Sequence, residues 1–175
     1  MGASGWWYRY EHQTDLAAAL HELQQAVFTS GDYYKVWENH PNYLQGWAAD
    51  LPMMVETMPD AFPPEVYDQA MIDGMAAGEE PATIEQARLW AMDSGTHSIL
   101  DIDGVSESPE PAMVSPLTET EAEQLFGSSE PTVDSIESRQ DELLALPVGA
   151  WTGRYIVAFE NGAPAALFFF GISGD

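Results

Sequence analysis

The sequence predicts an α+β fold, in which an antiparallel sheet of about four strands is covered by helices mainly on one face. Three observations predict this fold. An aromatic run over residues 6–10 favours a strand near the N-terminus. Asn161 and Gly162 separate two apolar runs, residues 154–160 and 163–170, and so indicate a C-terminal β-hairpin with a type I′ turn. Between these strands the chain carries helix start and stop signals.

The predicted hairpin has a definite register. With a two-residue loop, Glu160 faces Ala163 and Phe159 faces Pro164. The missing N–H of Pro164 then points away from the hairpin, because Phe159 and Pro164 form a non-hydrogen-bonded pair. We therefore expect that end of the second strand to have no neighbour on its far side.

Helices are predicted where apolar side chains recur at helical spacing between capping residues. The first follows an N-cap at Thr14 and ends at Gly31. Two more are expected over residues 63–75 and 84–94, the second with a capping box at Thr83. Shorter ones are expected over 119–126, again behind a capping box, and from residue 132 or 134 to about 146. Residues 32–63 have many aromatic side chains without a clear period, which predicts an irregular segment with a short helix near 43–50.

Residues 97–103 are predicted to form a central strand after a helix that ends at Gly95. An acidic loop rich in Pro and Ser is expected at about 105–117, and the whole chain, 1–175, is predicted to be a single domain.

No apolar run approaches the roughly 20 residues that span a bilayer, and the first residues lack a secretory signal pattern. A cytoplasmic protein that does not bind membranes is therefore expected.

Charge is the most unusual bulk property. The chain has 29 Asp and Glu residues against 5 Lys and Arg residues, a formal net charge of −24. Such a chain repels nucleic acid and anionic membranes, which disfavours direct binding to either. Three explanations stay open: a salt-adapted or generally acidic proteome, a surface that docks on a basic protein, or a mimic of the nucleic-acid backbone.

Familiar catalytic and cofactor motifs do not occur in the sequence. There is no Gly-rich phosphate loop, nucleophile elbow or dinucleotide fingerprint, and the chain has no Cys to supply a thiolate. No cofactor is therefore predicted. The remaining candidates for catalysis are His97, Asp101 and Asp103.

On an extended strand the two carboxylates would lie roughly 7 Å apart, with His97 roughly 13 Å from Asp101. If the chain bends, the three could act as base and acid or as metal ligands, with the metal left unknown. In the structural interpretation Asp101 and Asp103 end a strand and His97 is hydrogen-bonded locally.

An acidic surface with exposed aromatic side chains favours protein binding, because carboxylates steer association and Tyr and Trp anchor it. The candidate contacts are Asp32, Tyr33, Tyr34, Trp37 and Glu38. The sequence thus predicts a binding module for a basic partner protein, for example an inhibitor or immunity protein that blocks a nuclease-like toxin. The alternative is a small enzyme that uses the His/Asp/Asp group.

Several stretches resemble a group of small, uncharacterised acidic bacterial proteins. They are Gly31-Asp32-Tyr33-Tyr34, the pattern G-T-x-S-I-L-D-I over 95–102, Pro116-Leu117, and the tail over 170–175. The resemblance spans most of the chain. It implies a bacterial, soluble protein and carries over no catalytic residue.

Overall fold

The structure is a computed structural model that describes residues 4–91, 94–146 and 149–174. Backbone contacts divide the described residues into two compact units: the sheet unit, residues 4–33 and 94–174, and the helical unit, residues 34–91. Among the described residues, no helix is both long and apolar enough to cross a bilayer. The single domain expected from the sequence stays a prediction, because a division by contacts does not decide whether the units fold separately.

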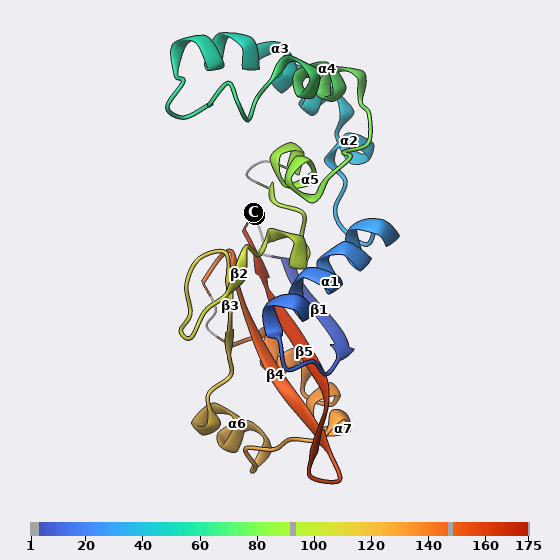
Figure 1. The fold of residues 1–175 in the computed structure, drawn as a ribbon, viewed down its shortest axis with the longest axis vertical. Helices are drawn as coiled ribbons and strands as arrows, with labels where there is room; N and C mark the ends of the chain where they lie inside the picture. Colours follow the sequence, from blue (N-terminus) through green and yellow to red (C-terminus); the bar gives the residue numbers. More distant parts are fainter. Residues whose placement is uncertain (1–3, 92–93, 147–148, 175) are drawn as a thin grey trace. The chain divides into compact units, whose positions relative to one another are not determined.

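Within the described residues, the sheet unit contains a five-stranded mixed sheet with the order β1-β5-β4-β3-β2 (Figure 1). The strands are β1 (Ser4–Glu11), β2 (Gly104–Val105), β3 (Met113–Pro116), β4 (Thr152–Glu160) and β5 (Ala163–Ser173). β5 pairs antiparallel with β1 and β4, whereas β4 with β3 and β3 with β2 are parallel. The α+β class is confirmed, but the prediction of about four antiparallel strands was wrong.

The parallel pair of β3 and β4 explains the difference. A crossover between parallel neighbours usually takes a dozen or more residues, and the one from β3 to β4 is long. Here it contains α6 (Glu119–Phe126), α7 (Val133–Glu137) and α8 (Gln140–Leu144). The predicted acidic loop is shorter than expected, because β3 occupies most of its second half and the loop itself runs over residues 106–112.

The C-terminal hairpin is confirmed in register and turn type. Asn161 and Gly162 have φ angles of 53° and 75°, as a type I′ turn requires. Phe159 pairs with Pro164, and a bulge follows between Ala158 and Phe159. The pairing of β1 with β5 begins at Ala166, so Pro164 lies beyond it, as its missing N–H predicts.

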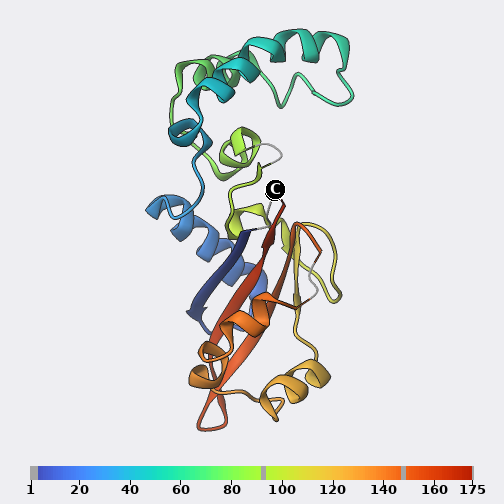
Figure 2. The ribbon, with the colours of Figure 1, turned by 180° about the vertical axis from the view of Figure 1, so that it is seen from behind.

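The strand β5 is buried on both faces. Its residues Leu167, Phe168, Phe169 and Phe170 are each 0% exposed, and neighbouring side chains of a strand point to opposite faces. α1 (Leu16–Ser30) packs against β1 on one face, while α7 contacts β4 and α8 contacts β5 on the other. Figures 1 and 2 show α1 and α7 on opposite sides of the sheet. Helices thus cover both faces, and the expectation that they lie mainly on one face was wrong.

The predicted strand over 97–103 was also wrong. His97 has a φ of 52°, and residues 99–101 form the 3₁₀ helix η2 (Ile99–Asp101). The side chain of Ser98 accepts a hydrogen bond from the backbone N–H of Leu100 and caps this helix. Such local side-chain bonds compete with an extended backbone, which explains why β-branched Ile99 does not lie in a strand.

The helical unit consists of α2 (Val36–Asn39), α3 (Pro41–Thr57), α4 (Gln69–Ala77) and α5 (Ile84–Ala91). α3 packs against α4, and α2 against α5. Leu44, Ala48 and Leu51 form the buried side of α3. The segment expected to be irregular therefore contains a helix of 17 residues. Pro41 stands in its first turn, where proline is tolerated, and Pro52 is on its exposed side.

One ion pair is built into the crossover connection. Arg154 of β4, with a side chain only 6% exposed, donates to Glu121 Oε2 at 2.6 Å and to the Pro116 carbonyl at 2.8 Å. Glu121 also accepts hydrogen bonds from the N–H and hydroxyl of Thr118, in the capping box that the sequence predicts. Burial of this carboxyl is the largest influence and raises its pKa, but the bonds from Arg154 and Thr118 outweigh it, so the pKa of Glu121 is lowered.

Replacing Glu121 by Gln should lower the free energy of unfolding at pH 7 by about 2 kcal/mol, because Arg154 stays buried and loses its counter-ion. The lowered pKa means that this contribution is present above the ordinary value of 4.5 and is lost as the pH falls below it. Urea unfolding at pH 7 and pH 3 measures the difference. The gap between the two proteins should shrink at pH 3, and an unchanged gap would contradict the prediction.

A second prediction concerns the close contact of β5 with Trp6. A Cβ at Gly171 would overlap the Trp6 ring and lie 2.6 Å from the carbonyl oxygen of Thr152. Gly171→Ala should therefore lower the free energy of unfolding by about 2 kcal/mol. At Gly149 a Cβ would meet nothing within 4 Å, so Gly149→Ala should change it by less than about 0.5 kcal/mol. Equal unfolding curves for the two variants would show that the contact is not tight.

Candidate functional site

Asp101 lies at the centre of a hydrogen-bond cluster in the sheet unit. Its Oδ1 accepts from the backbone N–H and the hydroxyl of Thr96, both at 2.8 Å, and its Oδ2 accepts from the Ser173 hydroxyl at 2.7 Å. The hydroxyls of Thr96 and Ser98 bond to each other at 2.8 Å. Thr96, Ser98 and Ser173 are buried. The carboxylate thus joins the chain before η2 to the end of β5, which is a structural role.

The other two predicted catalytic residues have different surroundings. Nδ1 of His97 lies 3.0 Å from the Ser4 hydroxyl, at the start of β1. Asp103 is exposed, and its backbone N–H bonds to the Ala112 carbonyl. Over the described ranges, no three His, Cys, Asp or Glu side chains are grouped so that they could hold a metal ion. Hydrogen bonds thus give Asp101 a structural role, but it lies in η2 and does not end a strand, and the bond of His97 reaches distant Ser4 and not a local partner. Catalysis by these residues stays an untested prediction.

Tyr8 borders the same cluster. Its hydroxyl donates to the Asp32 carbonyl at 3.4 Å. Burial, and then the charge of Asp32, raise the pKa of Tyr8 to about 12, although hydrogen bonds with Ser98 and Ile99 act in the opposite direction. A phenol with this pKa stays protonated near neutral pH and is not tuned to act as a general base there.

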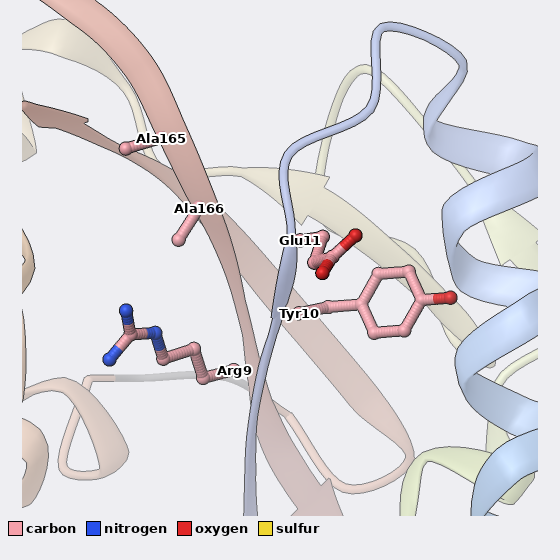
Figure 3. Close-up of a pocket in the computed structure, with 5 residues that line it drawn as sticks. All are labelled: Arg9, Tyr10, Glu11, Ala165 and Ala166. Atoms are coloured by element: carbon pink, nitrogen blue, oxygen red, sulfur yellow. The ribbon is translucent and has the colours of Figure 1, made fainter.

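A cavity of about 320 Å³ lies beside β1 and β5 and is lined by Arg9, Tyr10, Glu11, Ala165 and Ala166 (Figure 3). Figure 3 shows Arg9 and Tyr10 on opposite sides of β1. Arg9 forms an ion pair with Glu137 at 3.0 Å, and the Tyr10 hydroxyl donates to Glu22 at 2.9 Å. Both polar groups are thus already engaged in contacts that hold the sheet unit together, and the lining does not present a nucleophile beside a base.

The predicted partner-binding residues fall in both units. In the sheet unit, Asp32 is exposed, and Tyr33 stacks on Phe28 at 5.9 Å between ring centres. In the helical unit, Tyr34 is half-buried, which raises its pKa, and Glu38 is exposed and forms an ion pair with Lys35 at 3.2 Å.

Trp37 differs from the other predicted contacts because it is only 6% exposed. It packs edge-on against Trp90, with 5.8 Å between ring centres. Trp37 is therefore part of the core of the helical unit, and its burial does not support the prediction that it contacts a partner. Its position in the first turn of α2, facing α5, gives the physical reason.

Basic side chains form ion pairs within the part of the chain that the structure describes. Arg9, Lys35, Arg139 and Arg154 pair with Glu137, Glu38, Glu142 and Glu121. In the whole sequence, the acidic residues outnumber the Lys and Arg residues almost six to one, 29 against 5. The electrostatic potential outside the protein is therefore dominated by carboxylates.

Large exposed apolar side chains gather in the helical unit. Among the described residues they are Tyr43 at 52%, Met53 at 60%, Met58 at 46% and Val66 at 41% exposure. Sequence reasoning missed them because it did not predict α3 in full. The available signal was the spacing of Tyr43, Gly46, Asp50 and Met53, which places these four on one side of a helix.

Comparisons with protein-family models, curated proteins and solved structures found no match for this chain.

The structural role of Asp101 can be tested by comparing substitutions at Asp101 and at exposed Asp103. Asp101→Asn should lower the free energy of unfolding by about 2 kcal/mol, because the amide group turns a donor toward the donors Thr96 or Ser173. Asp103→Asn, which removes the same charge from an exposed residue, should change it by less than about 0.5 kcal/mol. Chemical unfolding followed by circular dichroism measures both, and an Asp101→Asn variant as stable as the wild type would remove the structural role.

Proposed function

We propose that this chain is an acidic protein-binding module that docks on a basic partner protein. The observation that carries the proposal is the excess of carboxylates: 29 acidic residues stand against 5 basic ones, and Arg9, Lys35, Arg139 and Arg154 already pair with carboxylates of the same chain. The remaining excess of carboxylates has no counterpart within the molecule. A partner with a basic surface supplies that counterpart.

Complementary charge mainly raises the rate of association and the selectivity for the partner. Charges of opposite sign steer two proteins together, and like charges exclude wrong partners such as nucleic acid and anionic membranes. Among basic proteins, an enzyme that acts on nucleic acid has a surface built for a dense row of phosphates. An inhibitor or immunity protein for such a nuclease-like toxin is the finer form of the proposal.

Affinity purification with the full-length chain tests the proposal. The immobilised protein is exposed to a bacterial lysate at 50 mM and 150 mM NaCl, and the recovered proteins are then purified and titrated individually. We expect at least one basic protein to bind with a Kd in the micromolar range or below at 150 mM NaCl, with affinity that falls as salt rises. Poly-L-lysine serves as a control for binding by charge alone. Recovery of no basic protein at either salt concentration would remove the proposal.

Salt adaptation is the competing explanation of the same charge, and it makes a different prediction. If the acidity serves a high-salt cytoplasm, the free chain should unfold in dilute buffer and gain stability at molar salt. Full stability in dilute buffer, measured by thermal unfolding at several salt concentrations, would favour docking. The cytoplasmic location stays a prediction under either explanation.

A further inference from the structure

One side of α3 carries apolar side chains that the helical unit leaves in solvent. Tyr43, Gly46, Asp50 and Met53 follow each other at spacings of three, four and three residues, and all four are exposed. We call these four residues the α3 stripe. Leu44, Ala48 and Leu51 form the other, buried side of the helix. At 1.5 Å per residue, Tyr43 and Met53 stand about 15 Å apart along the helix.

Gly46 is the informative member of the α3 stripe. Glycine inside a helix costs about 1 kcal/mol relative to alanine. A Cβ at Gly46 would meet nothing within 4 Å, so packing inside the protein does not require a glycine at this position. A residue without a side chain does allow another backbone to approach the helix closely, between the two apolar side chains.

The negative charge around the α3 stripe indicates which kind of partner segment binds there. Between Lys35 and Arg88 the sequence has no Lys or Arg and ten acidic residues, Glu38, Asp50, Glu56, Asp60, Glu65, Asp68, Asp73, Glu79, Glu80 and Glu85. A second copy of this chain is disfavoured, because it brings the same −24 charge. A stripe with two apolar side chains and Asp50 between them is instead complementary to a helix that has one apolar and one basic side.

We propose that the α3 stripe binds a basic amphipathic helix of the partner, which crosses α3 at Gly46. Tyr43 and Met53 are the apolar anchors on either side of the crossing, and Asp50 pairs with a Lys or Arg of the partner helix. A methionine suits this role because its side chain is flexible and adapts to different apolar surfaces. The inference rests on the proposed function and names the surface and the kind of segment that it binds.

The experiment uses the full-length chain and a fluorescent peptide of about 18 residues, made of Leu and Lys in an amphipathic helical pattern. A peptide of the same composition in scrambled order is the control for charge alone. Fluorescence anisotropy at 150 mM NaCl should show at least about tenfold tighter binding of the amphipathic peptide than of the scrambled one.

Variants of α3 separate this surface from general attraction. Met53→Glu adds a negative charge, so binding by charge alone would strengthen, whereas loss of an anchor should weaken it by about tenfold. Gln45→Glu adds the same charge to an exposed position on another side of α3 and should not weaken binding. Gly46→Gln should raise the Tm by about 2 °C, because helix propensity improves, and still weaken peptide binding by about tenfold.

The exposure of the α3 stripe has its own test. Hydrogen peroxide should oxidise Met53 several times faster than buried Met71 and Met75, as measured by mass spectrometry of the free chain. Slow oxidation of Met53 would mean that this surface is already covered and would overturn the proposal.

The remaining outcomes distinguish the two proposals. If the basic protein recovered by affinity purification binds wild type, Met53→Glu and Gly46→Gln equally well, the α3 stripe is not its site, and the proposed function stands. Equal binding of the two peptides would also overturn the α3 proposal. If no basic protein is recovered and neither peptide binds, the results contradict both the proposed function and the α3 proposal.

Discussion

Repulsion among carboxylates is the constraint that the rest of this structure has to meet. A net charge of −24 on 175 residues opposes a compact state. The sheet unit offsets it with apolar burial concentrated in β5, where four consecutive large side chains, Leu167 to Phe170, are fully buried. That burial requires layers on both faces of the sheet. The helices α1 on one side and α7 and α8 on the other follow from this requirement.

One of the few cations connects several elements of the fold. Arg154 lies almost completely buried on β4 and holds Glu121, which in turn caps α6 through Thr118. One charge therefore joins the strands β4 and β3, through the Pro116 carbonyl, to the start of α6. Arg9 links β1 to Glu137 at the end of α7 and lies 6.0 Å from the centre of the Phe168 ring. Of these two cations only Arg154 is buried, whereas the ion pair of Arg9 with Glu137 is exposed.

The sequence predicted those features that depend on neighbouring residues. The Asn161-Gly162 turn, the capping box of Thr118 and Glu121, and the end of α1 at Gly31 are all local signals, and the structure confirms them. The parallel pair of β3 and β4 was missed because it joins residues far apart in the sequence. The strand expected over 97–103 did not form for the opposite reason. The side chains of Asp101 and Ser98 accept local hydrogen bonds from the backbone N–H groups of Thr96 and Leu100, and these outweigh the strand preference of Ile99 and Ile102. For the candidate site, aromatic content alone did not distinguish buried Trp37 from exposed Tyr43.

Acidity by itself does not distinguish salt adaptation from docking, because both place carboxylates in solvent. The exposed apolar side chains on α3 support the docking proposal. An acidic coat that only keeps a protein soluble gains nothing from a tyrosine and a methionine more than half exposed on one side of a helix. It gains nothing from an exposed glycine in that helix either, since alanine would stabilise the helix without a clash. Both features acquire a physical reason when another helix packs there, because the apolar side chains are then buried and the glycine permits close approach. The same contact places Asp50 beside the partner, so charge and apolar burial act at one surface.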